Sequence, residues 1–228
     1  MERLTKPVNV VCFYWQKSDR PGWMDAELGK RYIINFYNAV KRNTTIDFNF
    51  ICLTTLDPFC DDFEFKKLEV PSWKGCLPKF AMFNPELGLE GRVFACDLDV
   101  FVVGNMDELF SYDGYFATRS AFKGPKLSGG DMVGFEGGDL EWIWKMFNDH
   151  TERVEKRTGG RERFLYRDFL HDKMDFFQDI YPDQIISYKA HIMKKKLKQI
   201  PTNARLISCH GFPRPHQITD EWAELNWR

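Results

Sequence analysis

The sequence lacks a basic excess and a long apolar run, and both absences exclude broad classes. Its net charge of −1 argues against a general polyanion binder, which usually carries excess Lys and Arg. No apolar run approaches the roughly 18–20 residues that span a bilayer, and the N-terminal segment is too short and too polar for a signal peptide. We therefore expect a cytoplasmic protein without a transmembrane segment.

Paired cysteines, repeats and low-complexity tracts are also lacking. None of the six cysteines belongs to a CxxC pair, and Cys12, Cys52 and Cys96 lie inside apolar, strand-like runs. This pattern indicates reduced, buried thiols in a reducing compartment. Because no linker is evident either, we expect one domain over residues 1–228.

Aromatic residues and one basic cluster are present instead. Aromatics make up 16% of the chain, which hints at a ring-bearing ligand as well as a packed core. The cluster MKKKLK, residues 193–198, lies either at a phosphate site or on a solvated face.

Apolar, β-branched segments alternate with amphipathic ones along the chain. Strands are expected at residues 8–15, 48–55, 67–70, 92–105, 114–120 and 132–136. Helices are expected at 26–43, 77–85, 105–110, 139–150 and 166–174, with a turn at Pro21-Gly22 and an exposed, charged loop at 152–163. This alternation predicts an α/β domain with a mostly parallel central sheet flanked by helices.

Two carboxylates interrupt the apolar stretch RVFACDLDVFVVGN. In a strand, Asp97 and Asp99 point to the same face, at the carboxyl end where open α/β sheets bind ligands. Two carboxylates so close repel each other, and a hard divalent ion such as Mg²⁺ or Mn²⁺ would resolve the repulsion. The alternative is that Asp99 ends the strand while Asp97 pairs with a lysine or arginine.

The strand, its DLD and the VFVVGNMDELF that follows the DLD resemble the metal-binding segment of nucleotide-sugar-dependent glycosyltransferases with the GT-A fold. They are especially similar to the group related to glycosyltransferase family 8. The resemblance implies a GT-A (Rossmann-like) domain, with a nucleotide-binding part at about 1–103 and a donor-sugar and acceptor part at about 104–228. It also implies that Asp97 and Asp99 hold Mn²⁺ or Mg²⁺, which neutralises the donor diphosphate as it leaves.

The segment SCHGFPRPHQI, residues 208–218, is similar to the HxxGxxKPW signature of that group. The similarity implies that His210 is the third metal ligand and that Gly211 and Arg214 contact the diphosphate. His216 is the weaker alternative ligand. The spacing differs from the signature, because glycine follows His210 at once and Arg214-Pro215 replaces Lys-Pro.

Other segments match the same group and imply further contacts. Asp131, in KLSGGDMVGF, would bond a sugar hydroxyl or act as a general base, and Asp183, in YPDQIISYK, would touch the sugar. The remaining donor-binding residues implied by the resemblance are Tyr14, Trp15, Lys79, Leu98, Ser128, Gly129 and Lys189. The alternatives are core aromatics at Tyr14 and Trp15, a solvated lysine at Lys79, and surface residues at Asp183 and Lys189.

The leading hypothesis is a metal-dependent hexosyltransferase that moves a sugar from a nucleotide-diphosphate sugar, most simply a UDP-sugar, to a hydroxyl of a glycan or other acceptor. A nucleotidyltransferase is disfavoured, because the segment after the first strand, QKSDRPGW, holds one glycine rather than a glycine-rich phosphate loop. A non-catalytic sugar- or nucleotide-binding protein is the third alternative. The sequence leaves open the sugar, the acceptor, the stereochemistry and the oligomeric state.

Overall fold

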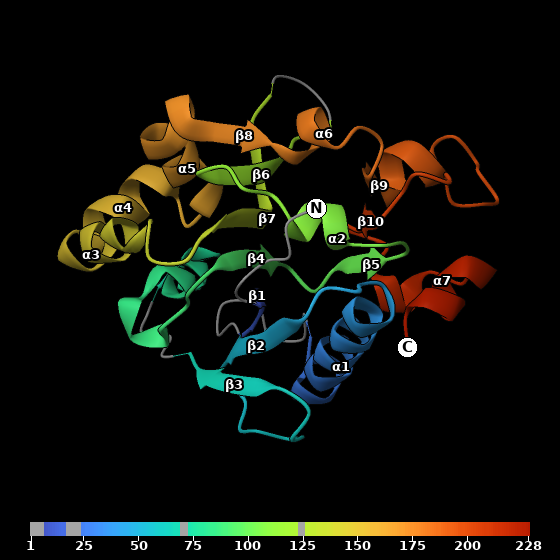
Figure 1. Cartoon of the computed structure of the whole chain (residues 1–228), viewed down its shortest axis with the longest axis horizontal. Coiled ribbons are helices and arrows are strands. Elements are labelled where there is room, and N and C mark those ends of the chain that lie inside the picture. The colour runs from blue at the N-terminus through green and yellow to red at the C-terminus, as the bar shows by residue number, and fades with distance from the viewer. Residues whose placement is uncertain (1–6, 17–23, 69–72, 123–125) are drawn as a thin grey trace.

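The computed structural model describes residues 7–16, 24–68, 73–122 and 126–228. The predicted turn at Pro21-Gly22, most of the QKSDRPGW segment, and residues 69 and 70 of the predicted third strand lie outside the described residues. The rest forms a seven-stranded central sheet with helices on both faces and a small three-stranded sheet at one end (Figure 1).

The central sheet has the strand order β3-β2-β1-β4-β7-β6-β8. The first four strands in that order are parallel, β7 is antiparallel to both β4 and β6, and β8 is parallel to β6. The bounds are β1 Val8–Tyr14, β2 Phe48–Thr54, β3 Glu64–Lys67, β4 Arg92–Cys96, β6 Phe116–Ser120, β7 Ser128–Glu136 and β8 Met174–Phe176. The predicted α/β class with a mostly parallel sheet is therefore confirmed.

Alternate residues of the inner strands enter two separate cores. Val10 and Cys12 of β1 pack against helix α1 (Ala26–Arg42), whereas Val11 and Phe13 pack on the opposite face. This is why the strands read as continuous apolar runs, since both faces of a central parallel strand are covered. Helix α1 begins at Asp25, whose side chain accepts a 2.8 Å hydrogen bond from the backbone N–H of Leu28.

The opposite face is covered by η1 (Leu77–Phe83) and by three helices, α3 (Glu141–Asp149), α4 (Thr151–Thr158) and α5 (Glu162–Leu170). The prediction of an exposed loop at 152–163 is wrong. Helix α4 buries only Val154 and Thr158, so its charged remainder hides the helical period. The glycines at 159 and 160 end α4 rather than extend a loop, because Gly159 adopts a left-handed conformation.

The predicted strand 92–105 is two strands in two sheets, separated by Asp97, Leu98 and Asp99. Strand β4 ends at Cys96, and β5 (Val100–Val102) pairs in the order β5-β10-β9 with β10 (Leu206–Ser208) and β9 (Ile185–Ser187). The chain changes sheets at the point where two acids would otherwise be buried in one strand. The remaining elements are η2 Pro85–Leu87, α2 Asp107–Phe110, η3 His171–Lys173, α6 Phe177–Ile180, η4 Tyr188–Met193, η5 Pro215–Gln217 and α7 Glu221–Asn226.

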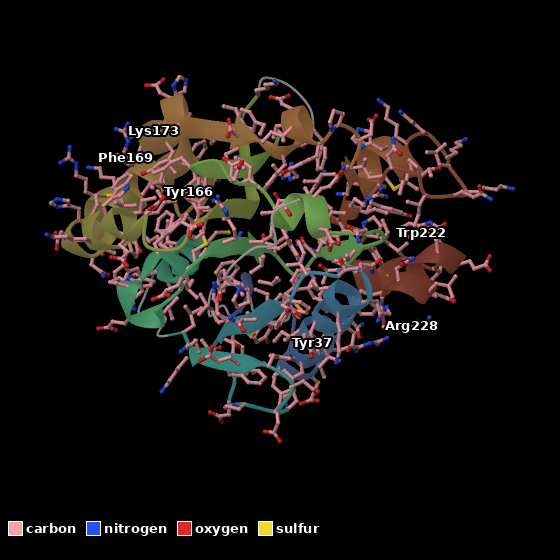
Figure 2. The ribbon with its side chains drawn as sticks, viewed as in Figure 1. Tyr37, Tyr166, Phe169, Lys173, Trp222 and Arg228 are labelled. Atoms are coloured by element: carbon pink, nitrogen blue, oxygen red, sulfur yellow. The ribbon has the colours of Figure 1, made fainter. Side chains whose placement is uncertain are left out.

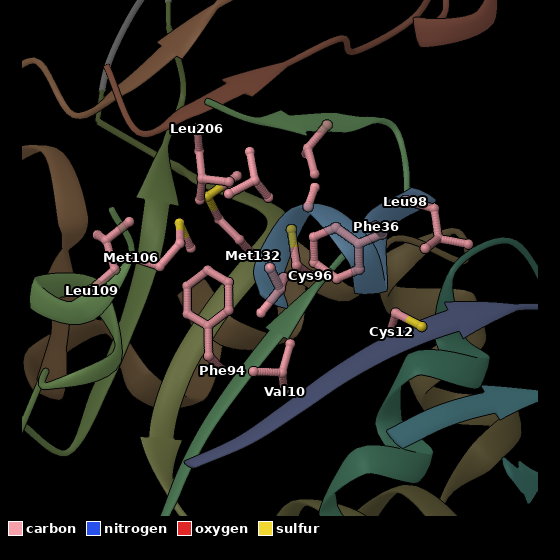
Figure 3. Close-up of a cluster of buried hydrophobic side chains, with 14 of the residues drawn as sticks. Val10, Cys12, Phe36, Phe94, Cys96, Leu98, Met106, Leu109, Met132 and Leu206 are labelled. Carbon is pink, nitrogen blue, oxygen red and sulfur yellow. The ribbon is translucent and has the colours of Figure 1, made fainter. Parts of the chain in front are cut away.

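Apolar packing joins the two sheets beneath the acid pair. Figure 3 shows Leu98 among buried side chains that include Cys96, Met132 and Leu206. Aromatic rings are buried towards both flanks of the molecule, among them Tyr166 of α5 and Trp222 of α7 (Figure 2). All six cysteines fall within the described residues and are free thiols. No helix in the described part of the chain is long and apolar enough to cross a bilayer.

Candidate active site

Asp97 and Asp99 are each attached to a different sheet. The backbone N–H of Asp97 donates a 2.7 Å hydrogen bond to the carbonyl of Asp131, which extends the β4–β7 pairing by one residue. The carbonyl of Asp99 accepts a 2.8 Å bond from the N–H of Cys209, next to β10. Strand pairing on both sides therefore fixes the acid pair at the carboxyl edge of β4.

Lys79 lies against Asp97 inside the protein. Only 4% of Lys79 is exposed, and its Nζ lies 2.6 and 2.8 Å from the two carboxylate oxygens of Asp97. It also donates to Glu162 at 2.8 Å and to the carbonyl of Gly130 at 3.2 Å. Burial alone would lower the pKa of Lys79, but Asp97 and Glu162 outweigh it and hold the pKa well above its usual value. Lys79 is therefore a charged interior group and not a solvated lysine.

Glu162 and Tyr166 belong to this site although sequence reasoning missed them. Both lie on α5. Glu162 falls in the predicted loop and Tyr166 in the predicted helix 166–174, and neither prediction indicates an approach to Asp97. The hydroxyl of Tyr166 is buried and has no hydrogen-bond partner among the described residues. Burial, followed by the nearby Glu162, raises the pKa of this hydroxyl well above its usual value.

Asp131 is held by two groups that the sequence also did not reveal. Its carboxylate accepts a 2.5 Å bond from Nε of Arg119 and a 2.9 Å bond from the hydroxyl of Ser208. Burial would raise the pKa of Asp131, but Arg119 outweighs it and the pKa is lowered. Gly129 makes room for this pair, because a Cβ there would overlap the Arg119 guanidinium. The glycine thus admits a charged side chain of the chain itself.

Asp99 forms an ion pair with Arg214, which lies 115 residues further along the chain. The side chains of Arg214 and Asp99 are 16% and 21% exposed. Burial raises the pKa of Asp99 although Arg214 opposes the shift, and burial raises the pKa of Asp97 to about 7 although Lys79 opposes it. The alternative in which Asp97 pairs with a lysine is therefore present in this structure, and Asp99 has a cationic partner as well.

The ring of His210 lies in a small aromatic stack. Its Nε2 is 3.0 Å from the hydroxyl of Ser187, and its ring stacks on Phe122 at 5.6 Å between centroids and 26° between planes. The Arg119 guanidinium lies 4.4 Å from the centre of the Phe122 ring. Burial, then Arg119 and Lys189, lower the pKa of His210, so the ring is neutral at pH 7.

Gly211 lies close to the ammonium of Lys189. It adopts φ +79°, and a Cβ there would lie 2.8 Å from Nζ of Lys189. The segment 208–218 thus has Lys189 beside its glycine and carries Arg214 three residues further along the chain. The Nδ1 of His216 lies 2.6 Å from the hydroxyl of Tyr32 on α1.

Three residues predicted to contact the donor pack inside the protein, and one of them, Leu98, stands between the two acids of the pair. Tyr14, Leu98 and Ser128 are buried; the Tyr14 hydroxyl donates to the carbonyl of Met24, and the Ser128 hydroxyl bonds that of Thr118. Trp15 is half-buried at the carboxyl end of β1. Asp183 occupies an exposed turn before β9 with φ 63°.

The acid pair suits a hard divalent cation in its chemistry. Carboxylate oxygens are the ligands that Mg²⁺ and Mn²⁺ prefer. In this structure the ammonium of Lys79 and the guanidinium of Arg214 supply positive charge beside the two carboxylates. Within the described residues, however, no three His, Cys, Asp or Glu side chains are placed to hold one metal ion together. The predicted set of Asp97, Asp99 and His210 is therefore not assembled in this structure.

The spacing of the C-terminal signature explains part of this difference. Counting back from Arg214-Pro215 in HxxGxxKPW, the glycine falls on Gly211 and the histidine position falls on Ser208. Ser208 faces Asp131, as its hydrogen bond shows, whereas His210 bonds Ser187. The side chain at the signature's first position is thus a hydroxyl in this protein.

Several solved structures that share this fold are glycosyltransferases. The chain superposes on the glycosyltransferase GlyE of Streptococcus pneumoniae TIGR4 with a TM-score of 0.68 and 14% identity, over 97% of this chain and 59% of that one. It superposes on the galactosyltransferase LgtC, solved with donor and acceptor sugar analogues, with a TM-score of 0.61 and 11% identity, over 95% and 93% of the two chains. The bifunctional glycosyltransferase WbbM matches with a TM-score of 0.61 and 10% identity.

These likenesses establish the fold. The predicted GT-A arrangement is confirmed, and the sequence itself matches no protein-family model and no curated protein. The chain spans 59% of the GlyE chain and 49% of the WbbM chain, so it corresponds to one part of those longer proteins.

Proposed function

We propose that this protein is a glycosyltransferase that moves a hexose from a nucleotide-diphosphate sugar, preferably a UDP-sugar, to a hydroxyl of a glycan or other acceptor. The observation that carries the proposal is the position of Asp97 and Asp99. They stand at the carboxyl edge of the central sheet, where open α/β sheets bind ligands, within a fold shared with GlyE and LgtC.

The donor diphosphate is proposed to lie against the segment around Gly211. Lys189 lies beside this glycine and Arg214 belongs to the same segment, and a glycine there lets backbone N–H groups approach phosphate oxygens closely. The nucleotide would extend towards residues 1–103, past Trp15 at the end of β1. The donor sugar and acceptor would lie over residues 104–228, near Asp131 and Gly129.

We further propose that Asp97 and Asp99 hold Mn²⁺ or Mg²⁺, with His210 as a third ligand once its ring leaves Ser187. Such an ion supplies Lewis-acid neutralisation of the diphosphate charge. Lys79 keeps Asp97 oriented and offsets part of its charge, because its ammonium is fixed between Asp97 and Glu162.

Asp131 is proposed to position rather than to remove a proton. Both of its oxygens accept hydrogen bonds, and its pKa is lowered, so it is a poor general base at neutral pH. It instead holds Arg119 and Ser208 beside the predicted donor sugar. Asp183 keeps its proposed contact with the sugar, from the exposed turn before β9.

The test is calorimetric titration with UDP in Mn²⁺ and in EDTA, followed by a panel of nucleotide sugars assayed for release of the nucleoside diphosphate. Ion-dependent UDP binding together with hydrolysis or transfer of one donor is the expected result. Pyrophosphate release from a nucleoside triphosphate and a sugar phosphate would instead identify a nucleotidyltransferase. Absence of any nucleotide binding would overturn both enzymatic functions and leave a non-catalytic protein.

A further inference from the structure

The two cations beside the acid pair differ in where they lie in the fold. Lys79 is almost wholly buried and donates to three acceptors, which are Asp97, Glu162 and the carbonyl of Gly130. Arg214 lies in the loop just before η5, next to Phe212, which is 71% exposed. Lys79 is therefore an interior group of the site, whereas the side chain of Arg214 is 16% exposed and belongs to a loop.

Both members of the Arg214–Asp99 pair are also the groups that the proposed ligands need. A divalent ion needs the oxygens of Asp99, and a diphosphate needs the N–H groups of Arg214, whose planar fork matches phosphate oxygens. While the ion pair persists, the metal ion cannot bind both oxygens of Asp99 and the diphosphate cannot bind all the N–H groups of Arg214. The pair therefore competes with the ion for Asp99 and with the diphosphate for Arg214.

We propose that Arg214 is an exchangeable counter-cation. It neutralises Asp99 when the site holds no ligand, and it transfers to the donor diphosphate when the ion and the nucleotide enter together. This inference rests on the proposed function. No covalent bond changes; one ion pair is replaced by two, Asp99 with the metal and Arg214 with the diphosphate.

Charge balance supports the exchange. Four carboxylates, of Asp97, Asp99, Asp131 and Glu162, are in contact with three cationic side chains, of Lys79, Arg119 and Arg214. Removing Arg214 from Asp99 without replacement would leave like charges close together at a partly buried edge, which is costly. A divalent ion that enters supplies the positive charge that Asp99 loses. The released arginine then neutralises part of the charge of the diphosphate.

The exchange makes the two ligands cooperative through this chain. Each ligand removes one partner of the ion pair and so frees the other partner for the second ligand, and such coupling is reciprocal. Mn²⁺ alone should then bind less tightly than the bare carboxylates would allow. The same arginine should favour UDP once Mn²⁺ is present.

The experiment compares the full chain with Arg214→Gln, using Mn²⁺ alone as the first probe. Titration followed by the paramagnetic resonance of free Mn²⁺ should show binding about fivefold tighter in the variant, at the low end of usual coupling because the pair is partly solvated. Calorimetry with UDP at saturating Mn²⁺ should show binding about tenfold weaker. The opposite signs distinguish exchange from simple loss of a phosphate contact.

Two further variants complete the design. Arg153→Gln removes the same charge from the exposed face of α4 and should change neither affinity. Arg214→Lys keeps the charge but not the fork, so Mn²⁺ alone should bind as in the unaltered protein while UDP binds with intermediate affinity. Thermal unfolding of each variant shows that it is folded, and the lysine variant retains the test if the glutamine variant does not fold.

The outcomes separate the exchange from the function on which it rests. If the unaltered protein binds UDP with Mn²⁺ but Arg214→Gln leaves Mn²⁺ affinity unchanged or weaker, the exchange alone is overturned. If the unaltered protein binds neither Mn²⁺ nor UDP, the proposed function is overturned along with it.

Discussion

Lys79 places its ammonium 2.6 Å from a carboxylate oxygen of Asp97, in the interior of the protein and 18 residues ahead of it in the chain. A buried ion pair of this kind is costly to break, because removing one partner leaves an uncompensated charge. This one contact links the proposed chemistry of the acid pair to the stability of the fold.

Replacing Lys79 with methionine should therefore destabilise the protein by about 3–5 kcal/mol, since Asp97 and Glu162 would lose their shared cation. Urea unfolding measures the change. The double variant Lys79→Met with Glu162→Gln should recover part of the loss, because one of the stranded charges is removed. Equal stability of Lys79→Met and the unaltered protein would contradict the interior placement of the lysine.

Replacing Asp131 with asparagine should cost about 3–5 kcal/mol, because buried Arg119 would lose its counter-charge. The Ser208→Ala variant is the matched comparison, since it removes only the second hydrogen bond to Asp131 and should cost about 1 kcal/mol. Chemical unfolding ranks the two variants. A larger loss for Ser208→Ala would mean that Arg119 does not depend on Asp131.

Replacing Asp99 with asparagine should lower kcat/KM for the donor identified by the panel by about 10²–10³-fold in buffer replete with Mn²⁺, the size of effect typical of losing a group that stabilises transition-state charge. Initial rates of nucleoside diphosphate release measure it. Asp61→Asn, an exposed acid away from this edge, is the control and should keep its rate. Full activity of Asp99→Asn would show that the acid pair is not the centre of the reaction.

Acid should remove a contribution made by Asp107, which joins the turn before β2 to α2. Burial alone would raise its pKa, but bonds from the hydroxyls of Thr44 and Thr45, each 2.6 Å long, and from the N–H of Thr45 outweigh it and lower the pKa to about 2. A lowered folded-state pKa stabilises the protein above the unfolded pKa near 4, and that stability is lost as the pH falls through 2.

Asp107→Asn should accordingly be less stable than the unaltered protein by about 1–2 kcal/mol at pH 7, with the difference shrinking between pH 4 and pH 2. Urea unfolding at a series of pH values measures the difference. Glu152→Gln, an exposed acid on α4, controls for net charge. A gap that stays constant with pH would exclude the carboxylate of Asp107 as its source.

Local pattern was sufficient for the central elements. The strands β1, β2 and β4 and the helix α1 follow directly from apolar runs and from three- and four-residue spacing, because a buried strand or an amphipathic helix shows its environment in its own side chains. Helix α4 was not predicted, because its two buried residues, Val154 and Thr158, are too few to show a helical repeat of apolar side chains.

Neighbouring residues also located the acid pair. Two aspartates after an apolar run mark a strand end whatever the rest of the chain does, and the structure places them at that edge.

What the sequence by itself determined is thus the α/β class and the position of the acid pair at a strand end. Only the tertiary structure decided which partner each acidic side chain contacts. Asp99 meets Arg214 across 115 residues, Lys79 meets Glu162 across 83, and Ser208 meets Asp131 across 77. Spacing along a chain carries no information on such contacts, because they are set by where separate strands and helices pack. It is the packing that gives each carboxylate of this site its partner.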